Sequence, residues 1–382
     1  MKTKYEETTS MNLSDQLQEK LALHNISRRK FIKFTTALTA SIGLPFAMVD
    51  KVVAAVDTPG RTPVIWLHFQ ECTGCTETLL RSLHPTVEGL VLDTISLDYS
   101  ETLLVAAGHQ AEKCMMDSVK LNNGKFILVV EGSIPTKDNG IYCKVAGKTP
   151  QETLLEVAPH ALACVAIGSC ASWGGVQSAG INPTGAKGLQ EVLGELNIEK
   201  PVINLPGCPA SPYNLLSTVV YFLTMNKLPE LDSKGRPLFA YGRLIHDHCE
   251  RRPHFDSGRF AQQFGDETHR LGYCLYKLGC KGPETYANCS TQKFCDVGAW
   301  PIGTGHPCFG CTEKEVGFTK PIHQQANVLS VTPPQAFGSV NQEKSGGISP
   351  GAAAVVGALA GAAVTAGVKA SKKLKNEPED QG

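Results

Sequence analysis

The sequence predicts an α/β domain with a parallel β-sheet, followed by a smaller domain that is rich in cysteine. Three observations support this prediction: short continuous apolar runs, helical stretches between them, and a change of composition near residue 238. Continuous apolar runs of strand length are typical of strands that are covered on both faces, as in parallel sheets. The first domain is therefore expected to be layered, with helices outside and the sheet between them.

The elements follow one another in the order that such a sheet requires. The apolar runs give five strands, at residues 64–69, 90–97, 126–130, 162–167 and 202–205. Helices are expected at 77–83, 152–157 and 189–196, where they would cover the faces of the sheet. This alternation predicts a doubly wound parallel sheet that resembles the flavodoxin-like type.

Four cysteines come directly after strands of this sheet. Cys72 and Cys75 follow the first strand, Cys170 follows the fourth and Cys208 follows the fifth. The carboxyl ends of parallel strands meet at one edge, where ligands of such sheets bind. Neighbouring glycines let the backbone come close and leave room for amide donors to the sulfurs. Four thiolates gathered at this edge can ligate one iron–sulfur cubane.

Two other uses of these cysteines remain open from the residues alone. A strand followed by Cys-x-x-Cys and a helix also begins the site of thioredoxin-like exchange proteins, and Cys72 with Cys75 fits that pattern. A dithiol exchange site has no need of two further thiols at Cys170 and Cys208, which favours a cluster. Structural zinc is the third alternative, although it commonly uses paired Cys-x-x-Cys knuckles rather than single cysteines.

The segment after residue 238 lacks long apolar runs, and seven of the 14 cysteines fall between Cys249 and Cys311. A segment that buries so little apolar surface depends on covalent or metal cross-links for its stability. A disulfide framework is the alternative, since the cysteine count is even. We favour metal, because the chain is longer than the small exported domains that usually depend on disulfides.

The two ends of the chain indicate export and a membrane anchor. Residues 27–33 (Ser-Arg-Arg-Lys-Phe-Ile-Lys) precede an apolar run that reaches Val49 and the small residues Ala54 and Ala55, as in a twin-arginine signal peptide. Residues 348–370 are mostly Ala, Val and Gly, and about 20 such residues can span a bilayer as a helix. Lysines at 369, 372, 373 and 375 place the C-terminus in the cytoplasm by the positive-inside bias.

The charge balance excludes one broad class of function. Lys and Arg total 36, Asp and Glu also total 36, and the formal net charge is zero. A nucleic-acid-binding protein normally shows a basic excess, so no nucleic-acid partner is expected.

Five motifs of the chain are similar to those of the small subunit of membrane-bound uptake [NiFe] hydrogenases. The resemblance covers about residues 63–326 and includes both ends of the chain. The motifs are Glu-Cys-Thr-Gly-Cys-Thr-Glu at 71–77, Gly-Ser-Cys-Ala-Ser-Trp-Gly-Gly at 168–175, Pro-Gly-Cys-Pro at 206–209, Arg-Leu-Ile-His-Asp-His-Cys-Glu-Arg-Arg at 243–252 and Gly-His-Pro-Cys-Phe-Gly-Cys at 305–311.

The resemblance implies three iron–sulfur clusters and assigns a set of ligands to each. A proximal [4Fe–4S] cluster would be held by the proximal set, which is Cys72, Cys75, Cys170 and Cys208. A distal [4Fe–4S] cluster would be held by the distal set, which is His246, Cys249, Cys274 and Cys280. A medial [3Fe–4S] cluster would be held by the medial set, which is Cys289, Cys308 and Cys311. The imidazole ligand of the distal set adds no negative charge, unlike a thiolate, and this raises the reduction potential of the distal cluster.

Residues around these sets refine the expected type of enzyme. By the same resemblance, Pro301 stands where a fourth ligand would stand in a four-iron medial site, and the nearby Cys295 is expected to be a buried non-ligand thiol. Oxygen-tolerant relatives carry extra cysteines at the positions of Gly74 and Gly175, so an ordinary proximal cluster and an oxygen-sensitive enzyme are expected. Three cysteines match no ligand position and are expected to be small buried apolar side chains: Cys114, Cys143 and Cys164.

The function that the resemblance implies is electron transfer within a hydrogenase. The Ni–Fe centre belongs to the partner large subunit, so this chain is expected to hold no catalytic residue. Electrons from H2 oxidation would leave towards an integral membrane electron-acceptor subunit and a quinone, from a body on the periplasmic side of the inner membrane. A dimer of such heterodimers is also expected. A protein that shares only the proximal motif, as in respiratory complex I, is a narrower alternative that the segment 249–311 argues against.

These expectations divide the chain into six parts. Residues 1–55 form the signal peptide, 56–237 the flavodoxin-like domain with the proximal cluster, 238–326 the domain with the medial and distal clusters, 327–347 a linker, 348–370 the transmembrane helix and 371–382 a cytoplasmic tail.

Overall fold

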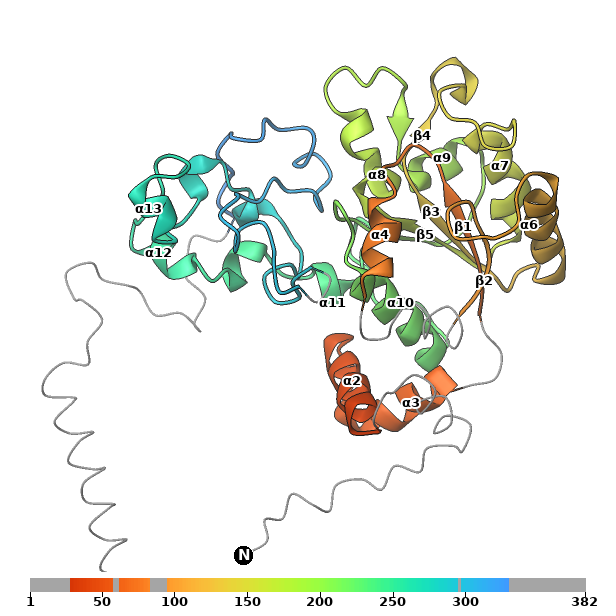
Figure 1. Cartoon of the computed structure of the whole chain (residues 1–382), viewed down its shortest axis with the longest axis horizontal. Coiled ribbons are helices and arrows are strands. Elements are labelled where there is room, and N and C mark those ends of the chain that lie inside the picture. The colour runs from red at the N-terminus through yellow and green to blue at the C-terminus, as the bar shows by residue number, and fades with distance from the viewer. Residues whose placement is uncertain (1–27, 58–61, 83–94, 295–296, 330–382) are drawn as a thin grey trace, which may run out of the picture.

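The computed structural model describes residues 28–57, 62–82, 95–294 and 297–329, and within them it places a layered α/β domain beside a domain of short helices and loops (Figure 1). The sheet of the first domain is parallel, with strand order β2-β1-β3-β5-β7. In chain order this is 2-1-3-4-5, the order of flavodoxin-like doubly wound sheets. The strands are β1 (Thr62–His68), β2 (Ile95–Ser100), β3 (Ile127–Glu131), β5 (Ala163–Ile167) and β7 (Val202–Leu205).

All five predicted strands are confirmed, with shifted ends. The largest shift is in β2, which begins at Ile95 and ends at Ser100, whereas the sequence predicted 90–97; residues 83–94 lie outside the described part of the chain. A short antiparallel pair, β4 (Ile134–Pro135) with β6 (Ala186–Lys187), was not predicted. Two residues per strand are too few to produce a period-two pattern in the sequence.

Helices cover both faces of the sheet, and strand residues alternate between two cores (Figure 1). Ile65, Leu67 and Leu128 point to one face, where they pack with helices α6 (His109–Leu121), α7 (Pro150–Val157) and α9 (Leu189–Glu195). Val64 and Trp66 point to the other face. That face is covered by α4 (Gly74–Leu80) and α10 (Pro212–Met225), and the helix α8 (Gly168–Trp173) follows β5 directly.

The predicted signal peptide begins outside the described residues and continues into them as two helices. Helix α2 (Arg28–Ser41) starts at the paired arginines, and α3 (Val49–Asp57) follows the short 3-10 turn η1 (Phe46–Met48). Leu38, Ile42 and Val52 are buried in the same core as α10. Helices α2 and α3 thus share a packed core with α10.

The second domain is built from short turns rather than from long regular elements. Its helices are α11 (Leu238–Tyr241), α12 (Arg252–Asp256) and α13 (Glu267–Arg270), and its 3-10 turns are η6 (Ile245–His248), η7 (Tyr276–Leu278) and η8 (Gly282–Glu284). The remaining 3-10 turns lie in the first domain: η3 (Lys137–Gly140), η4 (Ala158–His160) and η5 (Gly175–Ser178). Among the described residues no helix is long and apolar enough to cross a bilayer. The predicted anchor at 348–370 lies outside the described part.

Candidate metal centres

The proximal set lies at the carboxyl-terminal edge of the sheet. Cys72 and Cys75 follow β1, with Cys75 in the first turn of α4; Cys170 lies in α8, directly after β5; Cys208 follows β7. The turn into α4 is tight, because Thr73 adopts the left-handed conformation with φ 61°. The structure therefore brings the four predicted cysteines of this set to one edge. Cys72 and Cys208 are exposed there, while Cys75 is buried.

Glycines make room for the sulfurs of the proximal set. A Cβ at Gly168 would lie 2.6 Å from Sγ of Cys75, and a Cβ at Gly175 would lie 2.6 Å from Sγ of Cys170. Both glycines also have positive φ, 83° and 56°, which other residues adopt only at a cost. Side chains at these positions would displace the thiols.

Burial and mutual proximity raise the pKa of three proximal thiols, Cys75, Cys170 and Cys208. The pKa of Cys75 lies well above its usual range because of burial first, then the carboxylate of Glu131 and the thiols of Cys170 and Cys208. Burial raises the pKa of Cys170 to about 11, with Cys208 and Cys72 adding to the shift. Such thiols remain protonated at neutral pH unless a cation binds them, since a coordinating metal deprotonates a thiol outright. The four side chains are thus close enough to interact, and the thiols of Cys75 and Cys170 lose their protons at neutral pH only when a metal binds them.

Glu131 is a residue of this site that the sequence analysis missed. It ends β3, it is 2% exposed, and its Oε1 accepts hydrogen bonds from the backbone N–H groups of Cys75 and Thr76 at 3.0 and 3.3 Å. The indole of Trp66 donates to its Oε2 at 3.3 Å. The carboxylate therefore fixes the first turn of α4, and with it Cys75. A single glutamate at the end of an apolar run was the available signal.

The distal set lines a cavity of the second domain. His246, Cys249, Cys274 and Cys280 surround it, together with Arg251, Arg252, Leu275, Gly282 and Ile302. The three thiols are buried. The Nε2 atom of His246 is buried and has no hydrogen-bond partner. Burial and the neighbouring Arg252 lower the pKa of His246 to about 4, so its imidazole is neutral at pH 7 and its ring nitrogen can ligate a metal.

The medial set lines a second, neighbouring cavity. Cys289, Cys308 and Cys311 line it with Pro301, and Cys208 of the proximal set reaches the same cavity. Pro301 offers no ligand atom, and Cys289, Cys308 and Cys311 are the thiols of this cavity that do not belong to the proximal set. Burial raises the pKa of Cys289 to about 11. The proximal and medial sets are therefore neighbours, because Cys208 borders the cavity of the medial set.

The donor sets fit iron–sulfur clusters. No group of three His, Cys, Asp or Glu side chains within the described ranges converges in the way that holds a single metal ion. In a cluster each ligand binds a different iron, so ligands surround a space instead of meeting at a point. Four thiols, three thiols with an imidazole, and three thiols are soft donor sets of this kind. The unpartnered Nε2 atom that borders the distal cavity has the same explanation.

Every cysteine that the structure describes is a free thiol, so no disulfide framework forms in those ranges. The three cysteines expected to be buried non-ligands differ from one another. Cys164 is buried in β5, Cys143 is half-buried, and Cys114 is exposed on α6. The prediction for Cys114 is wrong, because this helix turns that position towards solvent. Cys295 lies outside the described residues.

Two family models match the chain, one on each domain. The model described as NADH ubiquinone oxidoreductase, 20 Kd subunit, matches residues 72–222. The model that describes the C-terminal part of the NiFe/NiFeSe hydrogenase small subunit matches residues 241–323. The second match covers the distal set and the medial set, which a protein with only the proximal motif would lack.

The hydrogenase-2 small chain of Escherichia coli (strain K12) is 54% identical over 352 residues, which cover 92% of this chain and 94% of that relative. The chain belongs to the family of [NiFe] hydrogenase small subunits. This hydrogenase small subunit is also 43% identical to the uptake hydrogenase small subunit of Azotobacter vinelandii, over 92% of the chain and 95% of the relative. The periplasmic [NiFe] hydrogenase small subunit 1 of Nitratidesulfovibrio vulgaris is 48% identical over 78% of the chain and 93% of the relative.

Solved structures give the same family. A [NiFeSe]-hydrogenase chain of Dm. baculatum superposes with a TM-score of 0.64 at 35% identity, covering 70% of this small subunit and 100% of that chain. An actinobacterial-type NiFe-hydrogenase chain from Ralstonia eutropha H16 reaches 0.63 at 26% identity, covering 89% and 97%. The hydrogenase small subunit is thus the electron-transfer part of an uptake-type [NiFe] hydrogenase, and this family uses iron–sulfur clusters for that purpose.

Proposed function

We propose that the proximal set holds a [4Fe–4S] cluster, the distal set a second [4Fe–4S] cluster and the medial set a [3Fe–4S] cluster. The observation that carries this proposal is the count of donors in the two cavities. One cavity is lined by three thiols and an unpartnered imidazole nitrogen. The other is lined by the three medial thiols, by Cys208, which belongs to the proximal set, and by Pro301, which offers no donor.

Iron–sulfur clusters, when bound, supply one-electron redox chemistry. The chain contributes spacing, exclusion of water and hydrogen bonds to the sulfurs. The backbone N–H of Ala210 donates to Sγ of Cys75 at 3.5 Å. The N–H groups of Arg251 and Gly310 each donate at 3.4 Å to Sγ atoms, of Cys249 and Cys308 respectively. Each such bond stabilises negative charge on a ligand, which favours the reduced form.

The large subunit with the Ni–Fe centre is the partner that would cover the proximal set. Cys72 and Cys208 are exposed in the isolated chain, whereas no member of the distal set is exposed. Exposed thiolate ligands would admit water and oxygen to the cluster, so this edge requires a covering surface. Electrons would then enter at the proximal set and leave from the distal set.

In the cell, electrons would pass from this chain to a quinone-linked membrane subunit. This rests on the predicted twin-arginine signal at the start of α2 and on the predicted anchor at 348–370, which lies outside the described residues. The body would face the periplasm, the C-terminus would lie in the cytoplasm, and two heterodimers would associate. The six parts of the chain would keep the bounds that the sequence predicts.

We further propose that the enzyme is oxygen-sensitive, because glycines occupy two positions beside the proximal thiols. A Cβ at Gly74 would lie 3.1 Å from Sγ of Cys72, and one at Gly175 would lie 2.6 Å from Sγ of Cys170. Extra cysteines at these two places would therefore have to enter the ligand shell of the cluster. With glycines there, the proximal cluster keeps four ligands.

Metal analysis and EPR on the purified complex test the ligand assignment. The wild-type small subunit should carry about 11 irons, the sum of two four-iron clusters and one three-iron cluster. The Cys208→Ala variant should lose the proximal cluster, with its EPR signal, and H2-dependent dye reduction. Cys114→Ala is the matched control, because Cys114 is an exposed non-ligand thiol in the same domain. Unchanged iron content in Cys208→Ala would refute this ligand, and an iron-free wild type would refute all three sets.

A further inference from the structure

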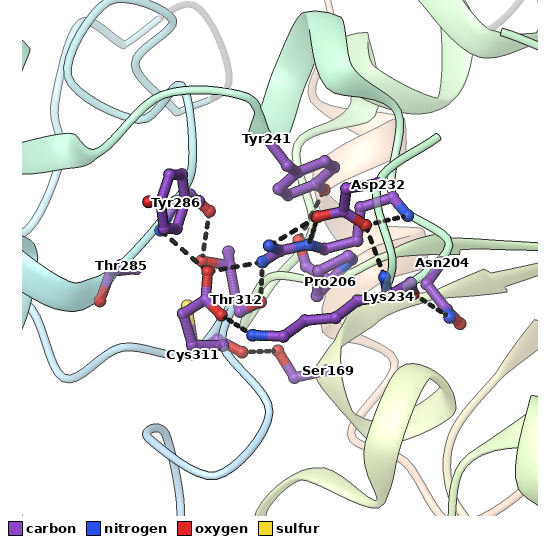
Figure 2. A network of polar contacts seen from close by, with 12 residues as sticks. Ser169, Asn204, Pro206, Asp232, Lys234, Tyr241, Thr285, Tyr286, Cys311 and Thr312 are labelled. Atoms are coloured by element: carbon purple, nitrogen blue, oxygen red, sulfur yellow. Dashed lines mark hydrogen bonds and ion pairs between the residues drawn. The ribbon is translucent and has the colours of Figure 1, made fainter. Parts of the chain in front are cut away.

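One buried hydroxyl group joins the proximal set to the medial set. Ser169 stands directly before Cys170 and is 1% exposed. Its backbone N–H donates to the carbonyl of Gly207 at 2.9 Å, and its Oγ accepts from the N–H of Gly207 at 3.1 Å. The same Oγ donates to the carbonyl of Cys311 at 2.6 Å (Figure 2). Ser169 thus contacts the Cys170 turn, the loop that carries Cys208, and a medial ligand.

A buried ion pair, Arg236–Glu313, holds the residues that follow Cys311 in place. Nη1 of Arg236 donates to the carbonyl of Thr312 at 2.8 Å and to Oε1 of Glu313 at 2.7 Å. Arg236 and Glu313 are 3% and 2% exposed. The N–H of Tyr286 donates to the same Oε1 at 3.0 Å, and Lys234 forms an ion pair with the other carboxylate oxygen. Three successive residues of the medial loop are therefore fastened to the rest of the protein.

The ion pair is itself tied to the loop of Cys208. The guanidinium of Arg236 lies over the ring of Tyr241, at 5.5 Å from its centroid. Its Nε also donates a hydrogen bond to Oδ2 of Asp232 at 2.8 Å. The hydroxyl of Tyr241 donates to the carbonyl of Pro206 at 2.8 Å. Pro206 begins the Pro-Gly-Cys-Pro loop. Two independent routes, one through Ser169 and one through Tyr241, therefore set the distance between Cys208 and Cys311.

We propose that Ser169, supported by the Arg236–Glu313 pair, is a positioning residue that fixes the separation of the proximal and medial sets for electron transfer between them. The inference rests on the proposed function of the two sets. The step moves one electron from the group at the proximal set, which is oxidised, to the group at the medial set, which is reduced, and no bond to the chain forms or breaks. The rate of such a step falls steeply with separation. Cys208 lines the same cavity as the three medial thiols, so the two sets are already neighbours.

The Ser169→Ala variant tests this in the complex with the large subunit. Without the hydroxyl, the buried carbonyl of Cys311 loses its donor and the medial loop moves away from the proximal set. After mixing with H2, the medial EPR signal should disappear roughly tenfold more slowly by rapid freeze-quench, since small misplacements have large rate effects. Isotope exchange between D2 and water, which needs no net electron transfer through this chain, should keep its rate. Iron content should also stay the same.

Two further variants act as controls. Ser172→Ala removes a hydroxyl from the same helix, buried and bonded only within its own domain to the carbonyl of Ala166 at 3.4 Å, and it should leave the freeze-quench rate unchanged. Ser169→Thr keeps the hydroxyl and should restore most of the rate. If Ser169→Ala fails to assemble, Glu313→Gln provides the same test, because it keeps the shape of the side chain and removes the charge that holds Arg236.

Three results would overturn the proposal. An unchanged freeze-quench rate in Ser169→Ala would show that the hydroxyl does not set the separation. Loss of iron from Ser169→Ala, but not from Ser172→Ala, would assign the residue to cluster retention instead of positioning. Equal slowing of isotope exchange would place the defect at the large subunit. Each differs from failure of the ligand assignment itself, in which the wild-type complex would lack the iron–sulfur signals.

Discussion

The two domains bury different kinds of side chain, and the difference decides what holds each together. In the sheet domain, strand residues such as Ile65 and Leu128 are 0% exposed and alternate between two apolar cores. In the second domain, the fully buried large side chains include Arg252 and Lys281, each 0% exposed. Burying aliphatic surface stabilises the first domain at roughly 25 cal/mol per Å². Burying charge does not stabilise a fold unless every charge is paired and hydrogen-bonded.

The second domain gives these charges backbone and side-chain partners, while Nη2 of Arg252 and Oδ2 of Asp256 are buried without one. Nζ of Lys281 donates to four carbonyls, those of Pro321, Ile322 and Gln324 at 2.9 Å and that of Gly279 at 3.3 Å. These bonds hold the segment 321–324 against the residue that follows Cys280. The apolar residues of this domain, such as Ile245, Leu275 and Ile302, join a core of the sheet domain instead of forming one of their own. We therefore expect the proposed metal sets to supply further cross-links.

Removing iron should therefore give the largest difference in stability between the two domains. We expect chelation under reducing conditions to abolish slow hydrogen exchange throughout residues 246–311, since the thiols would then be buried without a metal. The strands β3 and β5 should keep their protection, because their apolar contacts do not involve the clusters. Hydrogen exchange followed by mass spectrometry measures both regions in one sample. Retained protection in 246–311 would show that the second domain folds without its metal.

The sequence predicted the sheet well and the second domain only through its ligands. Continuous apolar runs identified the five strands, and cysteines after strands identified the edge where the proximal set lies. The period of two or 3.6 residues carries no information about a domain built from isolated turns. Ser169, Arg236 and Glu313 could not be found in this way, because they act through contacts between residues up to 142 positions apart.

Breaking a buried ion pair in the second domain should give the next largest effect. Arg252 donates to Asp256 at 2.8 Å and to Asp247 at 3.1 Å, and Asp256 is itself 4% exposed. Arg252→Met leaves a carboxylate buried without its cation, which typically costs about 3–5 kcal/mol. Pulse proteolysis in urea, with cleavage mapped to residues 246–311, measures the loss. Arg270→Met, at an exposed arginine of α13, is the control, and equal effects of the two substitutions would contradict the comparison.

A smaller effect, dependent on pH, is expected at the edge of the sheet domain. Burial raises the pKa of Glu101, directly after β2, to about 7, and its Oε2 is buried without a hydrogen-bond partner. Between pH 4.5 and 7 the folded chain therefore binds more protons than the unfolded chain, so the free energy of unfolding falls as pH rises. The total change is up to about 3 kcal/mol. Glu101→Gln should remove this part of the slope when urea unfolding is compared at about pH 5 and about pH 8; a slope equal to that of the wild type would show that another group causes it.

The smallest effect is expected from an exposed ion pair with the same sequence spacing as Arg252–Asp256. Arg81 and Glu77 also stand four residues apart, at 2.7 Å, but their side chains are 61% and 53% exposed. Water screens such a pair, so Arg81→Ala should lower the free energy of unfolding by only about 0.3–0.5 kcal/mol, and high salt should remove the difference. The same urea assay measures it beside Arg252→Met. Two ion pairs with equal spacing would then differ roughly tenfold in free energy, and burial alone would account for the difference. A loss of more than about 1 kcal/mol in Arg81→Ala would mean that Arg81 contacts something besides Glu77. The large subunit is the expected candidate, because it is expected to cover the edge beside Cys72.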